Sequence, residues 1–206
     1  TPLMVTRECL VKHLDDLLVA PVGLTDPSNN GLQVEGTEKV QRVVFGVDAC
    51  HALFEAAIDD GAQFIVVHHG ISWGNGFSRI VGADAHRLRL LLTHGISLYA
   101  SHIPLDCHPR LGNNAVLADL LNVQGKQPFG HYGGIPIGFQ GKLPEPVLLG
   151  DLVERIEERL GTRCKVLQPP HGQPIETLGI ISGGGADIVT QCSAAGVQCL
   201  LTGEIA

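Results

Sequence analysis

Two windows of the chain repeat the same pattern of apolar and polar residues, and this repeat constrains the fold more than any other feature. Arg42–Gly70 and Thr177–Ile205 are each 29 residues long and align without a gap, 135 positions apart. In both windows an apolar run of strand length precedes a helical pattern, and Gly61 or Gly196 separates that pattern from a second apolar run. We interpret the windows as a duplication; the alternative is that chance has aligned two units of a common architecture.

Short apolar runs alternate with helical patterns along the first half of the chain. The segments Arg42–Asp48, Gln63–Val67 and Ile96–Ser101 have the pattern of strands, and segments of helical period lie between them. Strands that alternate with helices across short connections are typical of a parallel sheet covered by helices. The sequence therefore predicts the α/β class, with two related halves of mainly parallel sheet character.

The density of Gly and Pro rises between Gln124 and Pro146, which indicates a domain junction or a meandering insertion. We therefore expect a first half over residues 1–125 and a second half over residues 126–206. If the second half repeats the first, a further helix, a strand and another His with a carboxylate should follow Glu204. The chain ends before them at Ala206, so we expect a second half that is cut short at its C-terminus.

Charge and composition argue against several classes of function. The formal net charge of −7 and the lack of a Lys/Arg cluster disfavour a nucleic-acid partner, and aromatic residues for base stacking make up only 4%. The six cysteines form no C-x-x-C pair, so neither a zinc ribbon nor a redox dithiol is indicated. Reduced cysteines, together with the lack of a signal-like or membrane-spanning apolar run, predict a cytoplasmic protein with no membrane partner.

The side chains that could carry chemistry follow predicted strands. His68 and His69 end the second strand of the first window, and His102 and Asp106 follow the next strand. In an open parallel sheet the carboxyl ends of the strands form the crevice where ligands bind, so we expect these residues to gather there. The repeat also aligns Glu204 with His69, which makes Glu204 a further candidate for lining the site. The structural alternatives are that the His pair caps its strand and that His102 hydrogen-bonds a loop.

Imidazole and carboxylate groups in this arrangement indicate a metal centre. Neighbouring residues of an extended backbone point to opposite sides, so His68 and His69 bind two adjacent ions more easily than one shared ion. Asp106 could bridge or complete such a pair, and nitrogen and oxygen ligands without thiolate suit zinc, iron or manganese. His102 is a candidate for proton transfer or for orienting a metal ligand.

Two other features at strand ends have structural interpretations. We expect Asp48 to cap the helix that follows it rather than to bind metal. The glycines Gly183–Gly185 resemble a phosphate-binding turn, but a tight connection from a strand to a helix is the interpretation we prefer.

Five short motifs occur in a fixed order along the chain. They are Asn30-Gly31-Leu32-Gln33-Val34-Glu35-Gly36, Val67-His68-His69-Gly70, His102-Ile103-Pro104-Leu105-Asp106, Leu111-Gly112-Asn113-Asn114 and Leu201-Thr202-Gly203-Glu204. The ordered set resembles the GTP cyclohydrolase 1 type 2 homologue family, whose members are also called NIF-three-like dinuclear-metal proteins. The resemblance covers essentially the whole chain and is closest to the short bacterial members.

The resemblance implies an α/β fold of two related halves, a toroidal homohexamer and a centre of two divalent metal ions per subunit. It matches His68, His69 and Asp106 to three metal ligands, and it implies further His and Glu ligands in a G-H-x-x-x-E-type motif beyond Ala206. Without those two ligands we expect the metal to be depleted. The implied activity is metal-dependent hydrolysis of a nucleotide-like small molecule, with GTP cyclohydrolysis as the named reaction. The alternative is a non-enzymatic hexameric scaffold that binds metal or a partner protein.

Overall fold

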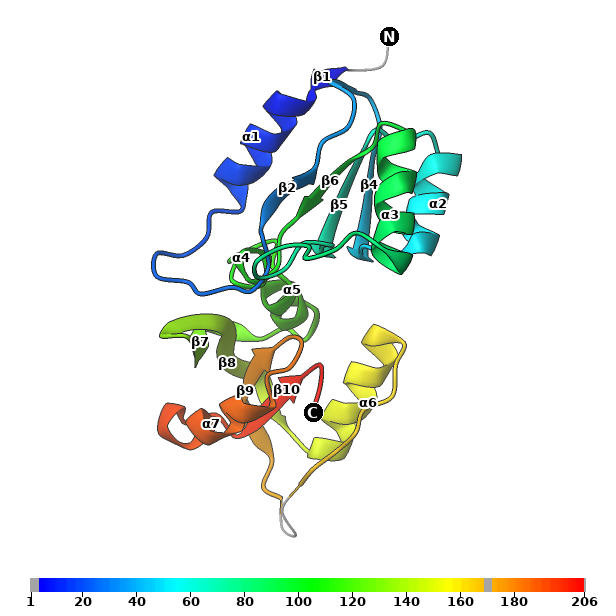
Figure 1. The fold of residues 1–206 in the computed structure, drawn as a ribbon. Coiled ribbons are helices and arrows are strands. Elements are labelled where there is room, and N and C mark those ends of the chain that lie inside the picture. The colour runs from blue at the N-terminus through cyan, green and yellow to red at the C-terminus, as the bar shows by residue number, and fades with distance from the viewer. Residues whose placement is uncertain (1–3, 169–171, 206) are drawn as a thin grey trace. The chain divides into compact units, whose positions relative to one another are not determined.

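The computed structural model describes residues 4–168 and 172–205, and the chain divides into two compact units, Thr1–Leu105 and Asp106–Ala206. Figure 1 shows the helices and strands of each unit. The sequence led us to expect a boundary between residues 125 and 126, which stays a prediction about the domains. The compact second unit begins earlier because helix α5 (Asn113–Leu120) packs against its sheet.

The first unit is built on a four-stranded sheet with the strand order β2-β6-β5-β4. Strands β4, β5 and β6 are parallel, whereas β2 is antiparallel to β6. A separate antiparallel pair joins β1 to β3. The elements in chain order are β1 (Val5–Thr6), α1 (Arg7–Leu17), β2 (Gly31–Val34), β3 (Lys39–Val40), β4 (Val43–Asp48), α2 (His51–Asp59), β5 (Phe64–His69), α3 (Gly82–Thr93), β6 (Ser97–Ala100) and α4 (Ile103–Asp106), the last of which crosses into the second unit.

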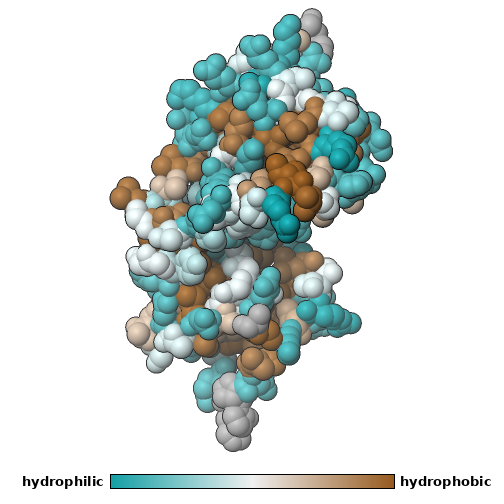
Figure 2. Space-filling view, in the orientation of Figure 1, coloured by the Kyte–Doolittle hydropathy of each residue, from teal (hydrophilic) through white to brown (hydrophobic). Residues whose placement is uncertain are grey.

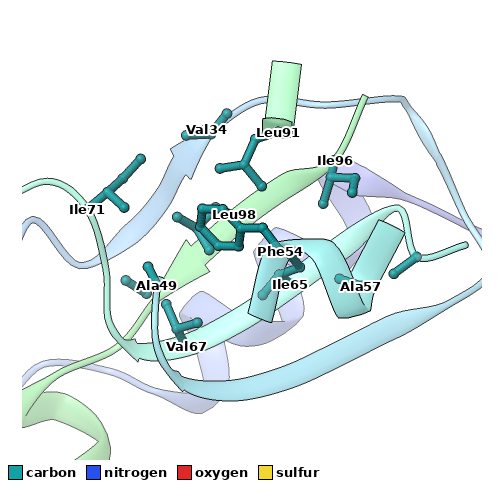
Figure 3. Packing of buried hydrophobic residues seen from close by; sticks show 12 residues of the cluster. Val34, Ala49, Phe54, Ala57, Ile65, Val67, Ile71, Leu91, Ile96 and Leu98 are labelled. Carbon is teal, nitrogen blue, oxygen red and sulfur yellow. The ribbon is translucent and has the colours of Figure 1, made fainter. Parts of the chain in front are cut away.

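Helices cover both faces of this sheet. Phe54 of α2 and Leu91 of α3 are completely buried against Ile65 and Leu98 (Figure 3), and burial of each such side chain contributes about 1.5–3 kcal/mol. Helix α1 packs Leu14 into a second cluster on the opposite face, because alternate residues of a strand point to opposite sides. The core therefore fixes the strands through their faces, and the side chains at the carboxyl ends of β5 and β6 remain available for a site.

The second unit contains another four-stranded sheet, with the order β10-β9-β8-β7. Helix α6 packs Leu152 and Ile156 onto one side of it, in a cluster with Leu178 and Ile180 of β9. The elements in chain order after α5 are β7 (Gln124–Tyr132), β8 (Ile135–Val147), α6 (Leu149–Leu160), β9 (Ile175–Ile181), the 3-10 helix η1 (Ala186–Ile188), α7 (Val189–Ala195) and β10 (Cys199–Thr202).

The fold is mixed α/β, and the mainly parallel character expected of both halves is not found in the second sheet. There β9 and β10 are parallel, but β7 with β8 and β8 with β9 are antiparallel. The Gly/Pro-rich segment, which suggested a junction or an insertion, forms the β7–β8 hairpin. Gly133 and Gly134 supply positive φ angles of 58° and 85° at its turn. Prolines such as Pro128 and Pro136 break the apolar alternation of these strands, so the sequence pattern concealed them.

The strand register of the two units agrees with the internal repeat. In the first unit β4 and β5 are paired from Val43 against Phe64, and in the second unit β9 and β10 are paired from Leu178 against Cys199. Both members of the second pair lie 135 positions after their counterparts, which is the offset that aligned the two windows. The register supports a duplication, since two unrelated strand pairs need not share one offset.

Two residue types keep the same role in both copies of the repeat. Gly61 and Gly196 each follow a helix with a positive φ, 68° and 70°, a backbone conformation that glycine adopts without strain. Gln63 and Gln198 each precede the second strand and accept, through Oε1, hydrogen bonds from two backbone amides near the start of the first strand. These glutamines therefore fasten the two parallel strands of each copy at the same end.

The surface carries both hydrophilic and hydrophobic residues, which Figure 2 shows intermixed on the visible face. Within residues 4–168 and 172–205, no helix combines the length and the apolar character that crossing a membrane requires. All six cysteines have free thiols.

Candidate metal centre

Three histidines gather at the carboxyl ends of two neighbouring strands in the first unit. His68 and His69 are the last residues of β5, and His102 follows β6 by two positions. Since β5 and β6 are adjacent and parallel, with Val67 opposite Ala100, their carboxyl ends bring the three rings to one place. One potential ligand atom of each ring lies within 4.8 Å of the others, a spacing that can hold a metal ion.

The two neighbouring histidines do not diverge as an ideal strand would make them. The ring centroids of His68 and His69 are 4.5 Å apart, and the His102 centroid lies 5.0 Å from the first and 5.4 Å from the second. The expectation that neighbouring rings point to opposite sides is therefore wrong at this strand end. The geometry suits a shared ion as well as two adjacent ions.

Each of the three rings is held through its Nδ1 atom. His68 Nδ1 lies 2.9 Å from the carbonyl oxygen of Ser101, and His69 Nδ1 lies 2.7 Å from Oδ1 of Asp48. His102 Nδ1 lies 2.7 Å from Oδ1 of Asp26. A carbonyl or carboxylate oxygen accepts a hydrogen bond, so each Nδ1 carries a proton and donates it. Rings held through Nδ1 offer Nε2 as the ligand atom, which fits a divalent metal, because metal-bound histidines are commonly oriented in this way.

Asp26 was not singled out by the sequence, although it contacts the cluster. Its carboxyl is in the loop before β2, and its side chain is only 5% exposed. Burial acts to raise the pKa of this carboxyl, but hydrogen bonds from His102, Asn30 and the Ser28 amide outweigh burial and hold the pKa below its ordinary value. The residue is therefore an ionised acceptor beside the cluster.

The expectation that Asp48 caps helix α2 is wrong. The N-cap of α2 is Cys50, and no side chain there accepts a hydrogen bond from the helix. The Asp48 carboxylate instead accepts the hydrogen bond from His69, with which it is paired across β4 and β5. Its position at the end of the edge strand, opposite His69, is the reason for this role.

Trp73 lies beside the cluster, in the segment that follows β5. Its ring centroid is 5.1 Å from that of His102, edge to face, and 6.1 Å from that of His69. The indole Nε1 donates to the carbonyl of Gly70, which fixes the ring over the turn that follows β5. Trp73 therefore presents an aromatic surface next to two of the three imidazoles.

Asp106 and Glu204, the acidic residues expected at the site, belong to the second unit. Asp106 is buried, and its Oδ1 accepts hydrogen bonds from Asn113 Nδ2 and Ser182 Oγ, each at 2.9 Å. Glu204 is exposed and borders a groove of about 960 Å³ along α6 and β10. Their roles as a metal ligand and as a lining residue stay predictions.

The glycine turn after β9 has a structural explanation. The Gly185 amide donates to Oγ1 of Thr202, and Thr202 Oγ1 in turn donates to the carbonyl of Gly183. The turn is therefore occupied by contacts to β10, in agreement with the interpretation of a tight connection.

Comparison with known proteins identifies the family of this chain. The profile of a family described as Duf34/NIF3 (NGG1p interacting factor 3) matches residues 5–206. This chain belongs to the Duf34/NIF3 family. The match confirms the resemblance that the ordered motifs indicated, and it covers both units of the fold.

Members of the Duf34/NIF3 family with the name GTP cyclohydrolase 1 type 2 homolog are similar over most of the chain. The relative from Deinococcus radiodurans is 42% identical over 200 residues, which make up 96% of this chain and 74% of the relative. The relative from Pyrococcus abyssi is 41% identical over 199 residues, covering 97% of this chain and 78% of its own length.

Solved structures share the fold of this Duf34/NIF3 chain. The protein ybgI, described as having unknown function, superimposes with a TM-score of 0.90 at 35% identity, over 98% of this chain and 79% of ybgI. TTHA1606 from Thermus thermophilus gives a TM-score of 0.87, also at 35% identity, over the same shares of the two chains.

Proposed function

We propose that this protein is a metal-dependent hydrolase of a nucleotide-like small molecule, with divalent ions held by His68, His69 and His102. The observation that carries the proposal is the convergence of three imidazoles whose Nδ1 atoms are all engaged by oxygen acceptors. In this proposal the Nε2 atoms of the three rings are the ligand atoms. The name of its relatives, GTP cyclohydrolase 1 type 2 homolog, supports a purine nucleotide as the substrate class.

The proposal extends to two ions per subunit, of zinc, iron or manganese, with Asp106 as a further ligand. Asp106 is included because the motif His102-Ile103-Pro104-Leu105-Asp106 resembles that of the family. Glu204 is proposed as a lining residue on the strength of the repeat, which aligns it with His69. The donor set of imidazole nitrogen and carboxylate oxygen suits all three metals.

Bound divalent ions would supply Lewis acidity toward an electrophilic carbon and toward the attacking water. The chain's own residues bind and orient the ions, and the Asp48 and Asp26 carboxylates hold two of the ligand rings. Trp73 offers an aromatic surface beside His69 and His102. His102, considered from the sequence as a proton-transfer group, acts as a ligand in this proposal because its Nδ1 is engaged by Asp26.

The test is incubation of the metal-loaded full chain with GTP and a panel of other nucleotides, followed by chromatographic detection of products. We expect turnover that a chelator abolishes and that is lost in His68→Ala and in Asp106→Ala. The matched control is His94→Ala, since His94 is the exposed C-cap of α3 and its Nδ1 lies 2.9 Å from the Leu90 carbonyl of that helix. Equal turnover in His68→Ala and the unmodified protein would contradict the proposal.

A second candidate is a non-enzymatic scaffold that binds metal or a partner protein. The reason to consider it is that, in the proposed arrangement, both nitrogens of each ring would be engaged, by an oxygen acceptor at Nδ1 and by metal at Nε2, so none of these rings would transfer protons. Stoichiometric metal binding without turnover of any nucleotide in the panel would support the scaffold over the hydrolase.

The family resemblance also leads us to propose a toroidal homohexamer in the cytoplasm, with a small molecule as its ligand. The free thiols of the six cysteines are compatible with a reducing compartment. Sedimentation velocity on the purified chain tests the assembly: six times the 21.9 kDa chain mass is expected, and a monomer would contradict it.

A further inference from the structure

The histidine cluster depends on a carboxylate that lies far from it in the sequence. Asp26 is in the loop between α1 and β2, 76 positions before His102, yet its Oδ1 lies 2.7 Å from His102 Nδ1. Only 5% of the Asp26 side chain is exposed, compared with 67% for Asp48, the carboxylate that holds His69. A buried carboxylate destabilises the fold unless both of its oxygens are hydrogen-bonded, so the partners of Asp26 indicate its role.

Three of the four partners of Asp26 can only donate. Oδ1 accepts from the Ser28 amide at 2.9 Å and from His102 Nδ1, while Oδ2 accepts from Asn30 Nδ2 at 2.9 Å and from the Ile103 amide at 3.1 Å. Backbone amides can only donate, and each oxygen faces one of them. Both oxygens are therefore acceptors, which requires His102 to donate from Nδ1.

The backbone around His102 is held by the same loop. Asn30 Oδ1 accepts a hydrogen bond of 2.7 Å from the His102 amide, and Asp26 accepts one from the next amide, that of Ile103. The loop therefore fixes both the start of the chain segment after β6 and the direction of the ring. With Nδ1 engaged, Nε2 is the nitrogen of His102 that remains to serve as its ligand atom, and one potential ligand atom of each of the three histidines lies within 4.8 Å of the others.

We propose that Asp26 is a positioning residue that fixes the Nδ1–H tautomer and the orientation of His102, so that Nε2 is presented to the metal centre. At His68 the Ser101 carbonyl holds Nδ1. Asp48 holds His69 from a largely exposed position, where water competes for the hydrogen bond. Asp26 is therefore the buried side chain that fixes the orientation of His102. The effect of Asp26 on metal binding rests on the proposed function, whereas its effect on the tautomer of His102 does not.

The first measurement uses the unmodified, metal-free full chain. Nitrogen-15 NMR of the imidazole rings, at a pH where they are neutral, distinguishes the two tautomers of His102. The structure predicts protonated Nδ1 and unprotonated Nε2, the opposite of the form that free histidine prefers in water. Because this measurement needs no variant, its result remains decisive even if a substitution prevents folding. Finding Nε2–H in the folded chain would overturn the proposal.

The second measurement compares Asp26→Ala with Asn30→Ala. Asn30→Ala removes loop contacts but keeps the carboxylate on His102, so it controls for a merely structural effect. In Asp26→Ala we expect the Nε2–H tautomer of His102 and a zinc affinity lowered about ten- to a hundredfold, as measured by competition with a chelating dye. In Asn30→Ala the tautomer should be unchanged.

The outcomes separate this proposal from the proposed function. If the unmodified chain binds no zinc but the tautomer changes as expected in Asp26→Ala, the positioning role stands and the metal centre fails. If zinc binds equally well to the unmodified chain and to Asp26→Ala, or if His102 keeps Nδ1–H in that variant, the positioning role is wrong.

Discussion

Gln33 holds the turn that follows the His68–His69 pair, and its replacement by Ala makes a quantitative prediction. Its Oε1 accepts from the amides of Ile71 and Ser72 at 2.8 and 3.1 Å. Its Nε2 donates to the carbonyls of Asn29 and Ser72 at 2.8 and 3.2 Å. One side chain therefore ties the turn after β5 to the loop before β2.

The magnitude follows from these four hydrogen bonds. Each contributes about 0.5–1.5 kcal/mol net, and the lower part of that range applies because Gln33 is only partly buried and water can replace part of what is lost. We therefore expect Gln33→Ala to lower the free energy of unfolding of the first unit by about 2 kcal/mol, which is roughly a thirtyfold change in its folding equilibrium. With a urea dependence of about 2 kcal/mol per molar, the midpoint should fall by about 1 M.

Urea denaturation followed by tryptophan fluorescence is the assay, because the chain has one tryptophan and it lies in this turn. Trp73 therefore reports the region that Gln33 holds. Gln33→Glu is the matched control: it keeps both accepted hydrogen bonds and loses both donated ones, so an intermediate midpoint is expected. An unchanged midpoint in Gln33→Ala, with unchanged hydrogen-exchange protection of the Ile71 and Ser72 amides, would refute the reasoning.

Further predictions concern the repeat, two glycines and a tyrosine. Gln63→Ala and Gln198→Ala should each destabilise their own unit by about 1 kcal/mol in urea, because both lose equivalent hydrogen bonds; an effect in one unit alone would contradict the equivalence. Gly36→Ala should lower the free energy of unfolding by about 3 kcal/mol, measured by thermal unfolding, because a Cβ there collides with backbone atoms. Gly150→Ala, in open space on α6, should raise it by roughly 0.5 kcal/mol. Burial and the hydrogen bond to Asp15 raise the pKa of Tyr99. The stabilising effect of this tyrosine is therefore present below the ordinary tyrosine pKa of 10.0 and is lost as the pH rises through the higher pKa of the folded chain. Ultraviolet titration of Tyr99 at the ordinary pKa would contradict this.

The sequence predicted those parts of the fold that depend on local periodicity. The gap-free alignment of the two windows anticipated the shared strand register, because the apolar alternation of β4, β5, β9 and β10 is set by the core that each strand faces. The β7–β8 hairpin was concealed for the converse reason. Its strands contain prolines and glycines tolerated by an antiparallel pair, and they lack a sustained apolar pattern.

The candidate site was predicted in part, for a related reason. His68 and His69 follow an apolar strand, and His102 follows the next one, so the rule for the ends of parallel strands brings them together. Asp26 and Trp73 lie in loops without periodicity, and their contacts with the rings arise only when the chain has folded. Asp48 follows a predicted strand, where a helix cap or a metal ligand was considered, and only the pairing of β4 with β5 brings its carboxylate to His69.

X-ray absorption at the metal edge of the zinc-loaded full chain tests the central claim most directly, because it reports the atoms bound to the metal. The account predicts nitrogen neighbours with the outer scattering pattern of imidazole, and a weaker imidazole pattern in His68→Ala. An oxygen-only shell without imidazole scattering, unchanged by His68→Ala, would contradict the claim that the three histidines hold the metal.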